Sequence, residues 1–174
     1  MMKLLRLTTE GILARGAPRR PESGFTLTEL VVTIAVGAIL ATLAVPSFND
    51  IIATEHADAA ASELYTSLIT ARSEAIRLDQ QVNITEGAGG WQYGWTTQST
   101  GSSATTVDTH GPMHGVTLQE TSGATSVTYF PYGRLAPGTA PMFVVTATTG
   151  SSTTTQCVSV DPTGTPYMQA GTTC

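Results

Sequence analysis

The sequence predicts an α+β protein in which one long N-terminal α-helix packs on a C-terminal antiparallel β domain. Two observations predict this architecture. Apolar residues form an uncharged run and then recur every three or four positions as far as Asp79, and the spacing changes to two after Gln80. The chain has 174 residues, of which 41% are hydrophobic and 12% charged, enough for one domain with a hydrophobic core.

The first half of the predicted helix is a candidate membrane segment. Residues 30–45 read LVVTIAVGAILATLAV, and no charged residue occurs from Leu30 to Asn49. About 20 residues of helix cover the roughly 30 Å hydrocarbon layer of a bilayer. Residues 1–24 contain five basic and two acidic residues, so the positive-inside rule places that end in the cytoplasm.

A cleavable secretory signal peptide is the alternative to a membrane anchor, because it also has a basic front and an apolar core. Glu29 near the start of the apolar run fits a signal peptide poorly, and so does Val45-Pro46 among the small residues where a cut would fall. Pro46 removes one helical hydrogen bond. We expect it to bend the helix near residues 42–46 without ending it.

The second half of the predicted helix, up to Asp79, is amphipathic. Its apolar residues are Phe48, Ile51, Ile52, Ala61, Leu64, Tyr65, Leu68, Ala71, Ala75, Ile76 and Leu78. Beyond Gln80, short β-rich runs predict strands at residues 82–85, 91–97, 116–120, 126–130, 142–148 and 156–160. The Ser-, Thr- and Gly-rich segments 98–113 and 149–155 are expected to be mobile loops.

Trp91, Tyr93 and Trp95 alternate along the predicted strand 91–97 and would therefore share one face. We interpret the two tryptophans as core residues, because buried aromatic side chains are common in small β domains. The alternative is an exposed aromatic platform that stacks on a ligand.

The charge of the chain beyond residue 24 argues against binding of nucleic acid. That part has three basic residues, Arg72, Arg77 and Arg134, against eleven acidic ones, a net charge of −8 (3 − 11). A body of this sign repels phosphate at long range. The three arginines could still cluster in space, although Arg72 and Arg77 are more typical of a solvated helix face.

One polar cluster is worth testing as a metal site or a catalytic site: Asp108, His110 and His114. Gly111 and Pro112 between the histidines exclude the helix that would present both to zinc. Because no further His or Cys cluster completes a site, we interpret this segment as a flexible loop. We expect no metal, no cofactor and no enzymatic activity, since catalytic and cofactor-binding motifs are also missing from the sequence.

Residues 24–30, GFTLTEL, resemble the prepilin cleavage motif of type IV pilins and type II secretion pseudopilins. The resemblance implies that a membrane peptidase cuts between Gly24 and Phe25 and that the new N-terminal Phe25 is methylated. It also implies that Glu29 meets the Phe25 amine of a neighbouring subunit, and that Pro46 kinks the helix. Glycine, phenylalanine, glutamate, the apolar run and the basic leader all occur in the required order.

Glu29 needs a partner on physical grounds as well. A carboxylate at the edge of the hydrocarbon layer costs on the order of 2–3 kcal/mol unless it is paired. Cleavage would create an α-ammonium group on Phe25, and the helix N-terminus adds partial positive charge. The alternative is that lipid headgroups solvate Glu29 as an ordinary interfacial residue. Close approach of neighbouring helices would be allowed by small residues, namely Ala35, Gly37, Ala38 and Ala41.

Three segments of the β domain, residues 91–95, 127–133 and 157–164, look like the pseudopilin H and FimT/FimU minor pilin group. FimT-like members implicated in DNA uptake resemble one another in a C-terminal Gly-Arg-x-Arg motif. This chain has Gly-Thr-Pro-Tyr at residues 164–167 instead. Without these two cations little binding energy is left for DNA, so a DNA-capture pilin for transformation is the disfavoured alternative.

Cys157 and Cys174 are the only cysteines. The expected topology places them in an oxidising periplasm, where an even number of cysteines usually indicates a bridge. We expect a disulfide that closes a C-terminal loop and contributes roughly 3 kcal/mol in the chain-entropy description, the alternative being two free thiols. By the same resemblance, a C-terminal cysteine favours a minor pilin of the type IV pilus over a secretion pseudopilin.

With the resemblance, the chain is expected to divide into a leader at residues 1–24, a helix at 25–80 with its transmembrane half at 25–47, and a periplasmic β domain at 81–174. The expected function is that of a structural subunit of a type IV pilus tip or a type II secretion pseudopilus in the bacterial inner membrane. The expected partners are other pilins or pseudopilins, the prepilin peptidase, membrane lipid and the inner-membrane assembly platform. A signal-anchored periplasmic protein without polymer partners is a third class, and its mature N-terminus would differ.

Overall fold

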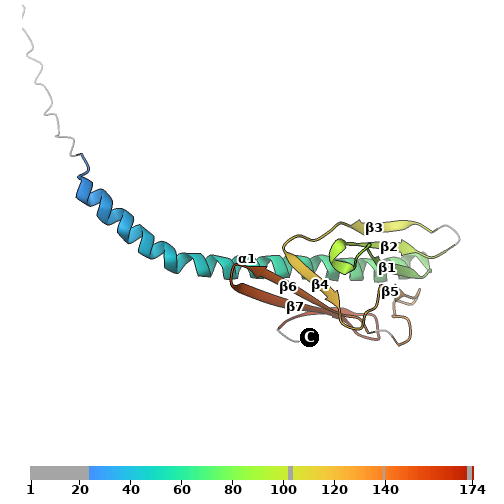
Figure 1. Cartoon of the computed structure of the whole chain (residues 1–174). Coiled ribbons are helices and arrows are strands. Elements are labelled where there is room, and N and C mark those ends of the chain that lie inside the picture. The colour runs from blue at the N-terminus through green and yellow to red at the C-terminus, as the bar shows by residue number, and fades with distance from the viewer. Residues whose placement is uncertain (1–23, 102–103, 139, 172–173) are drawn as a thin grey trace, which may run out of the picture. The chain divides into compact units, whose positions relative to one another are not determined.

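The structure, a computed structural model, describes residues 24–101, 104–138, 140–171 and 174, apart from the side chain of Pro46. This part of the chain holds one α-helix, α1 (Leu27–Leu78), one 3-10 helix, η1 (Trp91–Tyr93), and eight β-strands (Figure 1). The described part of the chain divides into two units, and the boundary between them lies between Ala38 and Ile39. The predicted α+β fold is confirmed.

Helix α1 begins two residues later than the sequence predicts, because Thr26 is its N-terminal cap. The Thr26 Oγ1 accepts the backbone N–H of Glu29 at 3.2 Å, and the Thr26 main-chain oxygen accepts that of Leu30 at 3.1 Å. The helix continues for 52 residues and includes Pro46. Pro46 therefore does not end it, and the bend at residues 42–46 stays a prediction.

In the second unit the strands form two antiparallel four-stranded sheets. The order in one sheet is β3-β2-β1-β5, made of β3 (Thr106–His110), β2 (Trp95–Ser99), β1 (Val82–Glu86) and β5 (Ser126–Tyr129). The order in the other is β4-β6-β7-β8, made of β4 (Val116–Glu120), β6 (Met142–Thr149), β7 (Ser152–Val160) and β8 (Pro166–Ala170).

An alanine-rich stripe of α1 packs against both sheets. Its buried hydrophobic residues are Ala53, Ala57, Ala60, Ala61, Leu64, Leu68, Ala71 and Ala75. Small side chains let the helix lie close to core residues of the sheets such as Ile84, Tyr129 and Phe143. The prediction that Phe48, Ile51, Ile52 and Ile76 share this buried face is wrong, since all four are exposed and alanines take the core positions instead.

A row of polar contacts joins one side of α1 to β7. The pairs are Ser152 with Asp50, Thr154 with Thr54 at 3.2 Å between the hydroxyl oxygens, and Gln156 with Asp58. The helix residues are four apart and the strand residues two apart, which correspond to about 6.0 Å and about 6.6 Å along each element. Because the two repeats nearly match, the same kind of contact recurs over about two turns of the helix.

The sequence predicted one continuous strand at residues 91–97, and this prediction is wrong. Residues 91–93 form η1 between Gly90 and Gly94, which have φ of 112° and 101°. A Cβ on Gly94 would lie 2.2 Å from the main-chain oxygen of His110, so the chain turns where only glycine fits. The three aromatic residues therefore share no strand face.

The interpretation of both tryptophans as core residues is confirmed. Trp91 and Trp95 are 3% and 1% exposed, whereas Tyr93 is 52% exposed. Trp91 packs edge-on against Phe143 with ring centroids 4.8 Å apart, and its Nε1 donates to the main-chain oxygen of Ala124 at 2.8 Å. The chain thus presents no exposed tryptophan platform.

Both segments predicted to be loops contain strand. Segment 98–113 holds β3, which pairs with β2, and segment 149–155 holds the β6–β7 turn and the start of β7. Threonine-rich sequence misled the prediction here, because threonine suits strands and its hydroxyls pair across them. Examples are the contacts of Thr146 with Thr155 at 3.3 Å and of Thr148 with Thr153 at 3.2 Å.

Strand β8 was not predicted, and it depends on the turn that precedes it. The Asp161 carboxylate accepts the backbone N–H groups of Thr163 at 2.8 Å and Thr165 at 3.1 Å. The Thr163 hydroxyl donates to the same carboxylate, and this hydrogen bond, together with the backbone ones, holds the pKa of Asp161 below its usual value. Pro166 occupies the first position of β8, one of the few strand positions that tolerate proline.

Candidate functional site

The residues of the predicted cleavage site precede α1. Phe25 is 77% exposed. A Cβ added to Gly24 would meet nothing within 4 Å among the described residues, and the φ of Gly24 lies outside the left-handed region. The fold of this chain therefore sets no requirement for glycine at position 24. A requirement for glycine there would come from a molecule that handles the segment, such as a peptidase.

Glu29 is exposed on the first turn of α1. Thr26 and Glu29 have the spacing of a capping box, in which the first residue caps the helix and a glutamate follows three residues later. Sequence reasoning missed this role of Thr26, although the pattern Thr-x-x-Glu was visible. Within the part of the chain that the structure describes, the Glu29 carboxylate has no ion pair or hydrogen bond, so its charge is available to an external partner.

The helix beyond Glu29 presents apolar side chains on every side. Exposed residues are Leu30, Val31, Val32, Ile34, Val36, Ile39, Leu40, Leu43 and Val45. In the described residues, α1 is the helix that is long and apolar enough to cross a membrane, and its most apolar window has no buried residue. The polar groups in this stretch are satisfied locally, because Thr33 and Thr42 donate to the main-chain oxygens of Leu30 and Ile39 at 2.8 and 2.7 Å.

Small residues interrupt this apolar surface. Ala35, Gly37, Ala38 and Ala41 are all exposed, and a Cβ on Gly37 would meet nothing within 4 Å among the described residues. A glycine inside a helix costs about 1 kcal/mol relative to alanine, and no contact of the described chain explains it. Close packing by another helix is a physical reason for small side chains here.

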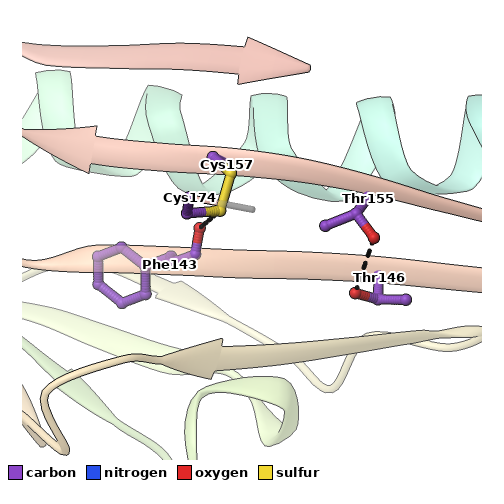
Figure 2. The surroundings of a disulfide bond; sticks show 5 residues. All are labelled: Phe143, Thr146, Thr155, Cys157 and Cys174. Carbon is purple, nitrogen blue, oxygen red and sulfur yellow. Dashed lines mark hydrogen bonds between the residues drawn. A yellow bond between two sulfur atoms is a disulfide. The ribbon is translucent and has the colours of Figure 1, made fainter. Parts of the chain in front are cut away.

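A disulfide joins Cys157 in β7 to Cys174 (Figure 2). The Cα atoms lie 5.5 Å apart, and the bridge spans 17 positions of sequence. The Cys174 Sγ lies 3.9 Å from the main-chain oxygen of Phe143 in the neighbouring strand β6. The bridge thus holds the C-terminal end of the chain against the β6–β7 ladder, and β8 lies within the loop that it closes.

Two of the three arginines, Arg72 and Arg77, have partners of different kinds. Arg72 Nε donates to the main-chain oxygen of Gly133 at 2.9 Å, next to Arg134 in sequence. Arg77 instead pairs with Glu74 on the same helix, with 2.5 Å between Nη2 and Oε2. The Arg77 guanidinium donates hydrogen bonds to Glu74 and holds the pKa of that carboxyl below its usual value. The pairing offsets the charge of Arg77 with that of a neighbouring acid.

The segment from Asp108 to His114 is folded, although the sequence predicted a flexible loop. His110 ends β3, stacks on Trp95 with ring centroids 4.3 Å apart and lies 2.9 Å from Glu63 of α1, measured from Nε2 to Oε2. His56 of α1 lines the same cavity as His110 and His114. Among the described residues, no three His, Cys, Asp or Glu side chains are placed to hold a metal ion together.

Comparison with protein families shows to which family this chain belongs. Residues 60–164, more than half of the chain, match the family described as Type II transport protein GspH, and residues 19–45 match the prokaryotic N-terminal methylation motif. The chain belongs to the GspH family. No curated protein gives a significant match.

Two crystal structures of the type IV minor pilin FimU from Pseudomonas aeruginosa have the fold of this GspH-family chain. The first matches with a TM-score of 0.58 at 22% identity and covers 70% of this chain and 96% of FimU. The second, from another crystal form, matches with a TM-score of 0.54 at 22% identity and covers 67% and 98%. At this identity the likeness shows the fold alone.

The family and the N-terminal motif establish that the chain is a pilin-like structural subunit, a minor pilin or pseudopilin of a type IV pilus or a type II secretion system. They also imply assembly with other pilins or pseudopilins and processing by prepilin peptidase. The apolar helix and the prepilin-type motif point to anchoring in the inner membrane. The basic leader residues of the motif lie outside the described residues.

Proposed function

We propose that the chain is made as a precursor, is cut between Gly24 and Phe25, and enters a pilus or pseudopilus through α1. In this proposal residues 1–24 are the leader, residues 25–80 the helix with its transmembrane half at 25–47, and residues 81–174 the periplasmic β domain. The N-terminus of the precursor is cytoplasmic. No residue has a catalytic role, since the work of the chain is assembly.

The observation that carries this proposal is the carboxylate of Glu29, which has no partner among the described residues and stands on a helix whose next 16 residues are uncharged and exposed. At the edge of a membrane an unpaired carboxylate costs on the order of 2–3 kcal/mol, and a neighbouring cation offsets that cost. Cleavage after Gly24 supplies one, because the new Phe25 amine keeps its positive charge after methylation, as a methylated lysine does. Pairing of Glu29 with the Phe25 amine of a neighbouring subunit then links processing to assembly.

Replacing the charge at Glu29 tests the pairing. The variant Glu29→Gln keeps the size of the side chain and should insert into the membrane and be processed like wild type. We expect its amount in the sheared filament or pseudopilus fraction to fall at least tenfold, the equivalent of about 1.4 kcal/mol. The matched control is Glu55→Gln, at an exposed acid later on α1. Wild-type incorporation of Glu29→Gln would refute the pairing role.

Cleavage is tested separately at Gly24. Because the described structure has open space at this position, Gly24→Phe should leave the β domain folded and still block the peptidase. The precursor would then run unshifted on a gel. The control Gly37→Ala changes another unhindered glycine, inside α1, and should be processed normally. Complete processing of Gly24→Phe would place the cut elsewhere.

The subunits that neighbour this chain in cells distinguish a type IV pilus from a type II secretion system. A photo-cross-linking residue at Tyr132, which is exposed on the β domain, would identify the neighbouring subunits in cells. Adducts with pilus subunits would assign the chain to the type IV pilus, and adducts with secretion pseudopilins would assign it to type II secretion. The C-terminal disulfide, by resemblance, favours the pilus.

A further inference from the structure

Each of the two sheets has two edge strands, and three of these four edges are protected. Strand β3 has a register shift and contains Asp108. Strand β5 is covered by residues 134–136, where the Ala136 N–H donates to the main-chain oxygen of Thr128 at 3.0 Å. Strand β4 lies beside η1 and ends with Glu120. Irregular register, charges and covering segments are common means of keeping an edge strand from pairing with another chain.

The fourth edge, β8, has none of these protections. Its five residues, PYMQA, include no charged side chain, and four of the five are exposed. Its register with β7 is continuous from end to end. Among the described residues β8 pairs with β7 alone. This strand is therefore open to pairing with a further strand.

The hydrogen bonds next to β8 show which of its backbone groups face the open edge. The Gly171 N–H donates to the main-chain oxygen of Thr155 in β7 at 3.2 Å. Because residue pairs that exchange hydrogen bonds alternate with pairs that do not, the backbone groups of Met168 and Ala170 point away from β7. Within the described chain these groups have no hydrogen-bond partner. Pro166, at the third outward position, has no N–H to leave unpaired.

A cavity of about 300 Å³ lies between β8 and α1. Its walls include Asp58 and Ser62 of α1, Gln156 of β7 and Met168 of β8, and Asp58 is the charged residue among those that line it. Met168 lies on the same face of the sheet as Gln156, whose amide donates to the Asp58 carboxylate. A strand paired with β8 would direct every second side chain over this face, beside the cavity. A basic side chain there would lie next to the carboxylate of Asp58.

We infer that β8 is a docking edge, to which another pilin or pseudopilin subunit adds an extended strand that carries a Lys or Arg beside Asp58. The inference rests on the proposed function, because assembly brings such subunits together. Charge determines which subunit fits. The chain beyond residue 24 has a net charge of −8 (3 − 11), and none of the eight described strands contains Lys or Arg. A second copy of this chain therefore lacks such a strand, and the partner is a different, more basic subunit.

The test uses the full chain in the cells that make it, with the photo-cross-linker p-benzoylphenylalanine in place of Tyr167, an aromatic residue of β8 that is 43% exposed. Mass spectrometry of adducts in the sheared filament fraction should identify a segment of a different pilin-like subunit that contains Lys or Arg. Adducts with a second copy or with a protein that is not pilin-like would overturn the inference. So would the lack of any adduct from a processed and incorporated chain. An uncut chain that is missing from this fraction would instead overturn the proposed function, and the inference with it.

Proline at position 170 tests the backbone pairing. Ala170→Pro removes an N–H that faces the open edge, at a kind of strand position that tolerates proline, so the pairing of β8 with β7 should persist. The yield of the adduct should fall at least tenfold, because the incoming strand loses a hydrogen bond and meets the proline ring. The matched control Ala170→Thr keeps the N–H and should give the wild-type yield. Deuterium exchange of the β7 amides in micelles verifies folding, and a wild-type yield from folded Ala170→Pro would overturn the inference.

Asp58→Asn tests the charge without relying on a backbone change. Asparagine keeps an oxygen that can accept the hydrogen bond from Gln156, and the yield of the adduct should fall about threefold through loss of the ion pair. The matched control is Asp50→Asn, which changes an aspartate of the same row of helix–strand contacts that does not line the cavity, and it should leave the yield unchanged. Asp58→Lys combined with an acid at the basic residue of the cross-linked segment should restore the adduct. No loss in Asp58→Asn, or an equal loss in both aspartate variants, would overturn the inference.

Discussion

Position 164 requires glycine for two reasons, its backbone conformation and the close approach of a neighbouring carbonyl group. Its φ is +89°, and an added Cβ would lie 2.1 Å from the main-chain oxygen of Gly133. Gly123 has a similar φ of +79° but open space around it. We expect Gly164→Ala to lower the free energy of unfolding by about 3 kcal/mol, and Gly123→Ala by only about 1 kcal/mol, because the latter costs backbone conformation alone.

Guanidinium unfolding of the full chain in micelles, followed by tryptophan fluorescence, measures both variants, since Trp91 and Trp95 are buried in the β domain. Equal losses at Gly164 and Gly123 would show that the turn around Gly164 can move away from Gly133.

Tyr129 makes the stability of the β domain depend on alkaline pH. It is fully buried, its hydroxyl has no protein partner among the described residues, and burial raises its pKa above the ordinary value. The unfolded chain loses this proton near pH 10 while the folded chain keeps it. The contribution of Tyr129 to the free energy of unfolding is therefore complete below pH 10 and is lost as the pH rises further.

Tyr129→Phe should weaken this alkaline loss of stability. At pH 7 it should leave the free energy of unfolding unchanged or raise it by about 1 kcal/mol, because it removes an unsatisfied hydroxyl. The control is Tyr132→Phe at an exposed tyrosine, which should change neither value. A loss above about 1 kcal/mol at pH 7 would reveal a hydrogen bond to the Tyr129 hydroxyl.

Single residues could be predicted where their chemistry is local in sequence. The roles of Gly24, Phe25 and Glu29 rest on a short motif and stay predictions, whereas the expected bridge of Cys157 with Cys174 is confirmed and needed only the number and compartment of the cysteines. His110 could not be interpreted this way, because its partner Glu63 lies on α1, far away in sequence. The spacing of residues in the sequence does not predict which residue of a helix contacts an edge strand.

At the scale of elements, the disulfide is expected to determine whether β8 stays paired. Cys174→Ser opens the loop of 17 positions that contains β8 and should lower the free energy of unfolding by roughly 3 kcal/mol. Deuterium exchange at the β7–β8 amides should rise more than at the β6–β7 amides. Wild-type chain reduced with dithiothreitol should match the variant. Unchanged β8 protection in both samples would contradict a role of the bridge in holding this strand.

The helix and four of the eight described strands could be predicted from the sequence, because β1, β4 and β5 alternate apolar and polar residues and β6 begins with four consecutive apolar ones. Strand β3 and the start of β7 were missed, since threonine-rich sequence resembles a loop when only its polarity is considered. Strand β8 depends on the Asp161 turn and on pairing with β7, which are tertiary features. The apolar residues Phe48, Ile51 and Ile52 are exposed on α1, because the buried part of the helix begins only at Ala53.

For the whole molecule, the net charge predicts that the protein does not bind DNA. The chain beyond residue 24 has a net charge of −8 (3 − 11), Arg77 is paired with Glu74, and Arg72 bonds to the backbone of Gly133. Few cations are therefore available to displace counterions from DNA. We expect the full chain in micelles not to retard DNA on a gel at 150 mM salt. Retardation that moderate salt abolishes would revive a role in DNA capture.

The central claim is that cleavage creates the amino group that Glu29 needs. Mass spectrometry of the N-terminal peptide of the protein from its native membrane tests this claim most directly. The account predicts a chain that begins with methylated Phe25. A chain that retains residues 1–24, or that begins at any residue other than Phe25, would contradict it.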